Sequence, residues 1–461
     1  MAVEAESASD LVVVGGGAGG MSAASRARRR RPDWRITVFE RGDYVSFILC
    51  GLPYYVDDVI ASHESLIVYT PEFFEKKRRI KVHTGHEVRR IDHERRLLEV
   101  TDVRTGRAFT WGYGRLIVAT GAEVRWPKME GIELGNVFAL RSIDDGRRIK
   151  SALQERGLRH AVIIGAGYIG VEMAEALTEA GLETVLIRAR PYVLPGIEPE
   201  IGEVVERELA DHGVRVHKEE TVQRLEGGER VEGVVSSRGR YPADIVILSV
   251  GARPAVALLE QAGMALGPTG AVATNERMET NLSGVYAAGD VAEAYHLVSG
   301  KAAWVPRGTT ANKQGRVAGE NAAGGNAVFR GIVGTAAVKV FGLQVARTGL
   351  SEAQAREAGF DPVGVTIEHP SHAGYYPGAA TLRVRLIADR QSGRLLGGQI
   401  VGREAAAKRV DVLAAALHAR MDVEAIIGLD LSYAPPFATA WEAIQIAAQQ
   451  VVGKIQRPNG S

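Results

Sequence analysis

The fold of this chain is decided by Leu11-Val12-Val13-Val14-Gly15-Gly16-Gly17-Ala18-Gly19-Gly20. The branched apolar residues predict a short buried strand, and the glycines predict a tight turn into a small-residue helix over 21–28. A second strand is expected over 36–39, ending at Glu40. A strand, a G-x-G-x-x-G turn, a helix and a second strand, in this order, are typical of a dinucleotide-binding unit.

The same pattern returns about 150 residues later. A strand over 161–164 leads into Gly165-Ala166-Gly167-Tyr168-Ile169-Gly170, a helix over 171–180 and a strand over 184–187. In each loop the first glycine permits the turn, the second lets backbone N–H groups approach a pyrophosphate, and the third lets the helix pack on the strand. Two such loops predict two bound dinucleotides and electron transfer between them. The expected contacts are Gly15, Gly17, Gly20, Gly165, Gly167 and Gly170.

The residue that ends the second strand of each unit is placed to contact a ribose. Glu40 can accept hydrogen bonds from ribose hydroxyls in the first unit. The second unit has Arg188 at this place and Arg190 two residues later. Because arginine suits a 2′-phosphate, we expect NADPH in preference to NADH, with use of both left open.

Composition limits the class of protein. A length of 461 residues predicts about three domains, and a net charge of +1 gives no general field for nucleic acid or membrane. No apolar run approaches the roughly 20 residues that span a bilayer, and residues 1–10 are too acidic and polar for a signal peptide. A single cysteine, Cys50, excludes an internal disulfide. We expect a cytoplasmic protein with no membrane or nucleic-acid partner and no metal centre.

Further motifs carry a resemblance to a known family. Ala119-Thr120-Gly121 closes a strand, Ala288-Gly289-Asp290 closes another, and Cys50-Gly51-Leu52-Pro53-Tyr54-Tyr55 follows Ser46-Phe47. Together with the two loops, these segments resemble the flavin-dependent pyridine nucleotide–disulfide oxidoreductases. The cysteine segment is most similar to the single-cysteine branch, which includes coenzyme A-disulfide reductase, NADH oxidase, NADH peroxidase and persulfide or polysulfide reductases.

The resemblance implies a fold and its cofactors. It implies an α/β protein with two Rossmann-like nucleotide-binding domains and a C-terminal α+β dimerisation domain, hence a homodimer. FAD is expected in the first site and NADPH (or NADH) in the second. The expected division is 9–120 and 251–328 for the FAD-binding domain, 121–250 for the NAD(P)H-binding domain and 329–461 for the interface domain.

The resemblance also implies roles for individual residues. Cys50 corresponds to the redox nucleophile beside the flavin, and its place at the start of a helix, facing a charged flavin, predicts a lowered thiol pKa. Asp290 corresponds to a residue that holds the flavin's ribityl chain, Tyr168 to an aromatic gate over the nicotinamide, and Glu172 to a carboxylate near the flavin. The turn at Thr120 and Gly121 completes the expected cofactor contacts.

Two features separate activities within the branch. Oxidases and peroxidases carry a histidine in the first loop, where this chain has Ala18, which argues against peroxide or oxygen as the main acceptor. The segments 371–378 and 431–436 resemble those that place one tyrosine each in the neighbouring subunit's active site. Tyr376, with Tyr375 as the alternative, and Tyr433 are therefore candidate catalytic residues.

A coenzyme A substrate carries phosphates and requires basic residues. In the resembling subgroup, the end of the first helix meets these phosphates. The candidate substrate-binding residues are Ser22, Arg26, Arg29, Ser46, Lys77 and Arg78. Leu49 and Trp441 differ from the residues common in coenzyme A-disulfide reductases, which leaves the physiological disulfide open.

The sequence thus predicts an FAD-dependent NAD(P)H oxidoreductase that reduces coenzyme A disulfide or related small disulfides through a mixed disulfide on Cys50. Two alternatives keep the fold but change the acceptor, to polysulfide or persulfide, or to oxygen. A flavoprotein that acts only through protein partners is a third alternative, in which Cys50 and the two tyrosine segments would be dispensable.

Overall fold

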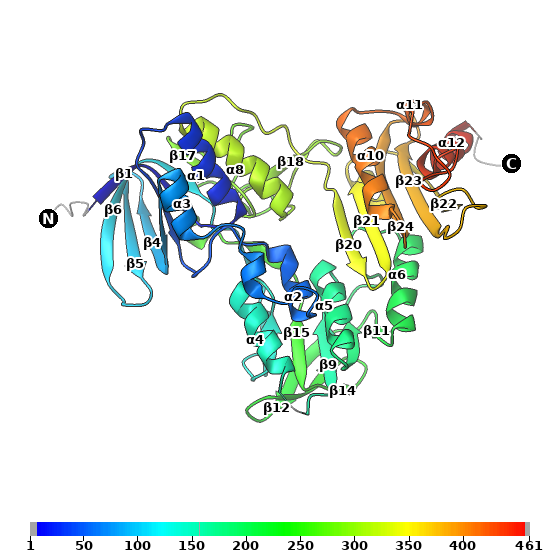
Figure 1. Ribbon diagram of the computed structural model, residues 1–461, viewed down its shortest axis with the longest axis horizontal. Helices are drawn as coiled ribbons and strands as arrows, with labels where there is room; N and C mark the ends of the chain where they lie inside the picture. Colours follow the sequence, from blue (N-terminus) through cyan, green and yellow to red (C-terminus); the bar gives the residue numbers. More distant parts are fainter. Residues whose placement is uncertain (1–6, 156, 457–461) are drawn as a thin grey trace.

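The computed structural model describes residues 7–155 and 157–456 of the chain, which form three α/β units (Figure 1). Residues 1–6, within the N-terminal segment predicted to lack a signal peptide, lie outside the described residues. The predicted fold class is confirmed: two nucleotide-binding sheets with flanking helices precede a C-terminal antiparallel sheet.

The first unit contains a seven-stranded sheet with the order β3-β2-β1-β6-β5-β4, and β17 also pairs with β6. Strands β1, β2, β3, β6 and β17 are parallel, as expected for a dinucleotide-binding sheet, whereas β4 and β5 form an antiparallel meander. The elements of this unit are β1 (Ser7–Val14), α1 (Ala18–Arg30), β2 (Ile36–Glu40), η1 (Leu49–Gly51), α2 (Leu52–Val56), η2 (His63–Leu66), α3 (Pro71–Arg78), β3 (Ile80–Thr84), β4 (His86–Asp92), β5 (Leu97–Asp102), β6 (Ala108–Val118), α7 (Ala257–Gln261), β17 (Val285–Ala287), β18 (Ala294–His296), β19 (Lys301–Ala303) and α8 (Gly308–Ala322).

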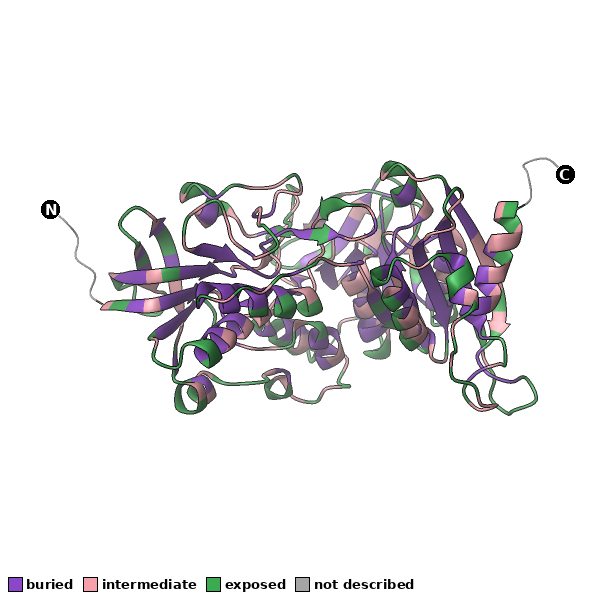
Figure 2. Ribbon diagram, turned by 90° about the horizontal axis from the view of Figure 1, so that it is seen from above, coloured by how far each residue is buried: buried purple, intermediate pink, exposed green. Residues whose placement is uncertain are grey.

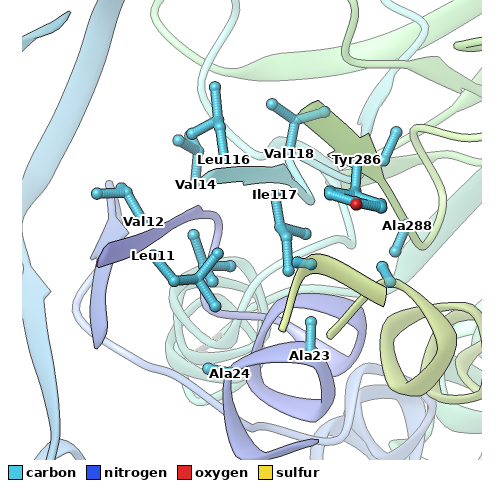
Figure 3. Packing of buried hydrophobic residues seen from close by; sticks show 14 of the residues in the cluster. Leu11, Val12, Val14, Ala23, Ala24, Leu116, Ile117, Val118, Tyr286 and Ala288 are labelled. Carbon is cyan, nitrogen blue, oxygen red and sulfur yellow. The ribbon is translucent and has the colours of Figure 1, made fainter. Parts of the chain in front are cut away.

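The core of this unit lies between the parallel strands and the helices α1 and α8. Branched residues of β1 and β6 cover small residues of α1, as Figure 3 shows. A Cβ on Gly315 would meet the Gly19 carbonyl, and one on Gly319 would meet the Ala23 carbonyl, each well under 3.0 Å. The two helices therefore pack backbone against backbone, which brings the start of α8 beside the first glycine loop.

The second unit is a five-stranded parallel sheet with the order β11-β10-β9-β15-β8 and a three-stranded antiparallel sheet beside it. A short ladder of β7 with β16 joins its two connections to the first unit. The elements are β7 (Ala122–Val124), β8 (Val137–Ala139), α4 (Ile143–Leu153), β9 (His160–Ile164), α5 (Tyr168–Glu179), β10 (Glu183–Ile187), α6 (Pro199–Asp211), β11 (Arg215–His217), β12 (Val222–Gly227), β13 (Val231–Ser236), β14 (Arg240–Pro242), β15 (Ile245–Leu248) and β16 (Ala252–Pro254).

The third unit is an antiparallel sheet with the order β20-β21-β24-β23-β22, covered by helices. In the view of Figure 2, the buried faces of its strands form a core separate from that of the first unit. Its last helix begins at Ala443. The elements are β20 (Ala336–Val340), β21 (Leu343–Gly349), α9 (Glu352–Glu357), β22 (Pro362–Pro370), β23 (Thr381–Asp389), β24 (Leu395–Gly402), α10 (Ala406–His418), α11 (Val423–Ile427) and α12 (Ala443–Gln456).

Candidate active site

The first glycine loop presents bare backbone to a ligand. Gly15 has a φ of +104°, and a Cβ there would collide with the carbonyl oxygen of Ala119. Gly20 likewise has no room for a side chain, whereas the space above Gly17 is open. Gly17 is the N-cap of α1 and makes no side-chain cap, and the first turn of the helix carries no acidic residue. The helix therefore begins with free N–H groups and a positive end, which fits a pyrophosphate.

The second loop repeats this geometry at the start of α5. Gly165 has a φ of +106°, and a Cβ there would collide with the carbonyl oxygen of Ser249. A Cβ on Gly170 would collide with the Gly165 carbonyl, so strand and helix are in close contact. Gly167 caps α5 without a side-chain hydrogen bond, and a Cβ there would find only Ser249 Oγ, at 4.0 Å. Both predicted dinucleotide loops thus fit the group expected of them.

Glu40 is fixed beside the first loop. Its Oε2 accepts from the Gly16 N–H at 2.7 Å, and its Oε1 accepts from the Gly42 N–H at 2.7 Å. Since β2 ends here, the carboxylate is held where a ribose attached to the pyrophosphate would meet it.

Arg188 is the corresponding residue of the second unit, and it is buried without a complete set of partners. Its residue exposure is 8%, and neither Nε nor Nη1 has a hydrogen-bond partner among the described residues. Burial lowers its pKa, which Glu206 partly offsets. That carboxylate is already paired with Lys218 at 2.7 Å. A buried guanidinium in this state fits an anionic group. Arg190 is exposed.

Asp290 lies in a turn after β17. Its carboxylate pairs with Arg141 Nη2 at 2.8 Å, and its carbonyl accepts from Trp304 Nε1 at 2.7 Å. Sequence reasoning missed Arg141 because nothing in its local pattern marks it. The predicted turn at Thr120 and Gly121 forms the crossing between the first two units, where Thr120 Oγ1 donates to the Ala255 carbonyl at 2.9 Å.

Cys50 lies in the short turn η1, directly before α2, and its side chain is accessible. The helix α2 packs against α4 and α5 of the second unit, through Leu52 and Tyr55. One turn beyond Cys50, Tyr54 Oη donates to Glu172 Oε1 of α5 at 3.5 Å. The first and second units therefore meet at the thiol.

The helix start does not lower the Cys50 pKa as predicted, whereas the lowering expected from a charged flavin stays a prediction. Although Cys50 is exposed as a residue, the surrounding protein partly desolvates its sulfur, and this is the first cause that raises the thiol pKa; Glu172 is the second, while Arg307 opposes the shift. The helix that follows has only five residues, too few for a strong helix dipole. Burial also raises the pKa of Glu172 to about 7 and that of Tyr54 to about 12. The thiol thus has two weakly acidic neighbours.

Tyr168 begins α5, four residues before Glu172 and on the same face of the helix. The guanidinium of Arg307 lies over its ring, 5.0 Å from the centroid. Sequence reasoning did not single out Arg307, which has no motif around it.

The predicted substrate-binding residues have different partners and do not all line one pocket. Ser22 Oγ donates to Asn312 Oδ1 at 2.6 Å, and Arg26 pairs with Glu320 at 2.6 Å. Arg29 lies near Arg26, Arg78 and Arg316, which together with burial lower its pKa. An open pocket of about 570 Å³ is lined by Arg26, Arg29, Arg30, Arg31, Glu320, Ala323 and Gly324.

The remaining candidates lie outside that pocket lining. Arg78 Nη1 donates to Ser25 Oγ at 2.5 Å, and Lys77 is exposed. Ser46 follows the first loop and donates its N–H to the Gly16 carbonyl at 2.9 Å.

The candidate tyrosines lie on two exposed loops of the third unit. Tyr375 is 77% exposed and shares a hydrogen bond with Tyr433, which raises its pKa. Tyr376 instead packs edge-on against His372, with ring centroids 5.6 Å apart. Arg409 holds both loops, because its Nη2 donates to the Ser371 carbonyl at 2.6 Å and to the Phe437 carbonyl at 3.1 Å.

Comparisons with known proteins agree with this arrangement. Residues 9–315 match the family model of pyridine nucleotide-disulphide oxidoreductases, and residues 335–444 match the dimerisation domain of the same family. An NAD(P)H sulfur oxidoreductase (CoA-dependent) of Pyrococcus abyssi is 39% identical over 91% of this chain and 93% of its own length. A coenzyme A disulfide reductase of Staphylococcus aureus is 30% identical over 87% of this chain and 90% of its own length.

Solved structures agree as well. An NAD-dependent persulfide reductase from A. fulgidus has a TM-score of 0.94 at 39% identity, over 96% of this chain and 83% of that one. The reduced CoADR-RHD of Bacillus anthracis has a TM-score of 0.94 at 35% identity, over 98% of this chain and 81% of that one. The prediction from the motifs is confirmed: the chain belongs to the pyridine nucleotide-disulphide oxidoreductase family.

Proposed function

We propose that this FAD- and NAD(P)H-dependent enzyme reduces coenzyme A disulfide, or a related small disulfide, through a mixed disulfide on Cys50. The observation that carries the proposal is the position of the single cysteine: it is accessible and lies at the contact of α2 with α5, between two dinucleotide loops. The proposed division is 9–120 and 251–328 for FAD, 121–250 for NAD(P)H and 329–461 for dimer contacts, of which 457–461 lie outside the described residues.

The chemistry at sulfur consists of two displacements. The Cys50 thiolate attacks one sulfur of the disulfide, forms a new S–S bond and releases the first thiolate. Bound FAD would supply the two electrons, taken from NAD(P)H, that break this mixed disulfide and release the second thiol. Glu172 and Tyr54 lie within reach of each other beside the sulfur, so they can hold the proton that a departing thiolate requires. Each turnover consumes one NAD(P)H and one proton and yields two thiols.

NADPH is the proposed preferred reductant because of Arg188. Its buried, incompletely partnered guanidinium supplies the donors that a 2′-phosphate would accept from, and Arg190 adds an exposed charge beside it. The cradle for FAD is assigned to the first loop with Glu40, and to Asp290 held by Arg141.

The substrate's phosphates are assigned to the end of α1 and to α3. Arg29 is the strongest candidate, because it has no ion pair among the described residues, whereas Arg26 is already paired with Glu320. Ser22, Arg78 and Lys77 extend the same polar surface, and Ser46 is assigned to the part of the substrate nearer the sulfur.

We assign the exposed tyrosines to the active site of a partner subunit in a homodimer. Tyr433 and Tyr376 are the first candidates from the sequence, and the hydrogen bond between Tyr375 and Tyr433 supports Tyr375, the alternative to Tyr376. A cytoplasmic location accords with this thiol chemistry. No helix of the described residues is long and apolar enough to cross a membrane.

The test compares the wild-type enzyme with Cys50→Ser in steady-state assays. We expect the variant to retain flavin and NAD(P)H binding but to lose disulfide turnover by several orders of magnitude. Disulfide reduction that survives the substitution would refute the mixed-disulfide mechanism. The intact mass before and after dithiothreitol provides a second measurement, in which loss of a coenzyme A-sized adduct identifies the substrate class.

A second candidate is reduction of persulfide or polysulfide by the same cysteine. The relatives named for sulfur or persulfide reduction reach 38–40% identity, whereas the coenzyme A disulfide reductase of Staphylococcus aureus stands at 30% and the CoADR-RHD of Bacillus anthracis at 35%. Initial rates with coenzyme A disulfide and with polysulfide, at equal NADPH, would rank the two acceptors.

A further inference from the structure

Arg307 carries a positive charge that no acidic residue between positions 7 and 456, apart from the undescribed residue 156, neutralises. It precedes α8 as its N-cap, and among the residues that the structure describes it forms no ion pair. Its Nε is buried and has no hydrogen-bond partner among the described residues. Arg26 and Arg141, by contrast, are paired with Glu320 and Asp290. An unpaired, partly buried guanidinium is costly unless another negative group balances it.

The contacts of Arg307 lead to the redox cysteine. Its guanidinium lies over the ring of Tyr168, which shares one face of α5 with Glu172. Glu172 accepts from Tyr54, which lies four residues beyond Cys50. Arg307 and Glu172 therefore belong to one cluster, joined through Tyr168 at the start of α5, and Cys50 lies one turn before Tyr54 in the same cluster.

The groups around the sulfur shift the pKa of the Cys50 thiol in opposite directions. Burial, Glu172 and Asp290 raise the thiol pKa, whereas Arg307 and Arg141 lower it. Arg307 is the larger of the two lowering influences. The charge of Arg141 is already met by its ion pair with Asp290. The charged and titratable groups around the sulfur are Glu172, Tyr54, Asp290, Arg141 and Arg307.

We propose that Arg307 stabilises the Cys50 sulfur as a thiolate, which makes it a further functional residue of this redox centre. The inference rests on the proposed function, because only a nucleophilic cysteine benefits from such a charge. The same charge would favour an anionic sulfur acceptor, such as a persulfide, over a neutral one. The helix α2 has only five residues, so its dipole is too weak to stabilise the thiolate. The guanidinium of Arg307 provides this stabilisation instead.

The test measures the thiol directly, which a chain with one cysteine permits without ambiguity. Flavin-loaded enzyme is reduced with dithiothreitol, freed of reductant without oxygen, and alkylated with iodoacetamide from pH 5.5 to 10. Intact mass gives the rate at each pH. Because only the thiolate reacts, the profile reports the pKa of Cys50. The variants are Arg307→Met, Arg307→Lys and, as a control, Arg330→Met, which removes an exposed arginine outside these contacts.

We expect Arg307→Met to react about tenfold more slowly near pH 7 and to reach the wild-type rate at high pH, which corresponds to a pKa raised by about one unit. Arg307→Lys should recover most of the rate, and Arg330→Met should match the wild type. A profile unchanged in Arg307→Met would overturn the inference. So would equal slowing in Arg307→Met and Arg307→Lys, because a lost packing contact, and not a lost charge, would then be the cause.

The flavin absorbance and the elution volume of each variant show whether it is folded and loaded. The two proposals fail separately. If Cys50→Ser keeps its disulfide turnover, the proposed function fails, whatever the alkylation profiles show. If Cys50 is essential but its profile does not respond to Arg307, only the present inference fails.

Discussion

Replacement of Glu172 by glutamine should make the protein more stable at neutral and alkaline pH. Burial raises the pKa of this carboxyl from 4.5 to about 7, against a smaller lowering by the hydrogen bond from Tyr54. Between these two values the folded state binds a proton that the unfolded state has lost. The free energy of unfolding therefore falls as the pH rises through this range, by up to about 3 kcal/mol, and the full stability is present below pH 4.5.

Glutamine keeps the shape of the protonated carboxyl but cannot ionise. Glu172→Gln should match the wild type near pH 4.5 and exceed it by up to about 3 kcal/mol at pH 8. The assay is thermal unfolding of both proteins at matched FAD saturation, at several pH values between 4.5 and 8. Glu179→Gln, on the exposed side of the same helix, is the matched control and should follow the wild type. A Glu172→Gln curve parallel to the wild type at every pH would refute the reasoning.

Three further changes test other parts of the structure. Gly319→Ala forces a Cβ against the Ala23 carbonyl between α1 and α8, and thermal unfolding should show a loss of about 1–3 kcal/mol or more. Arg188→Met should raise the KM for NADPH by about 10- to 100-fold and leave that for NADH nearly unchanged, since a charged hydrogen bond contributes about 1.5–3 kcal/mol; equal changes for both would contradict the assignment. Arg409→Met releases both tyrosine loops, so kcat should fall about tenfold while gel filtration still shows a dimer.

The parts of the site that could be predicted from the sequence follow local rules. A glycine loop acts through backbone conformation, so the spacing of Gly15, Gly17 and Gly20 predicts its geometry without knowledge of the rest of the chain. Arg188 follows from its place at the end of a strand in the same unit. These features are encoded within about 30 consecutive residues, where sequence spacing fixes distance in space.

The parts that could not be predicted depend on contacts between distant segments. The hydrogen bond from Tyr54 to Glu172 joins residues 118 positions apart, and the ion pair from Arg141 to Asp290 joins residues 149 apart. Neither spacing carries a local signal. The helix start failed to lower the Cys50 pKa for the same reason, because a helix start is local whereas burial and Glu172 come from the packing of α2 on α5.

Proton and electron chemistry are therefore coupled at the junction of the first two units. With its pKa near 7, Glu172 carries a negative charge in only part of the molecules at neutral pH, and each time it ionises it opposes the thiolate of Cys50. A proton on Glu172 thus favours the nucleophilic sulfur, and attack on a disulfide generates a thiolate that can take that proton away. Arg307 acts in the same direction as the proton. The ionisation of Glu172 makes the thiolate content of Cys50 depend on pH, while the guanidinium of Arg307 favours the thiolate.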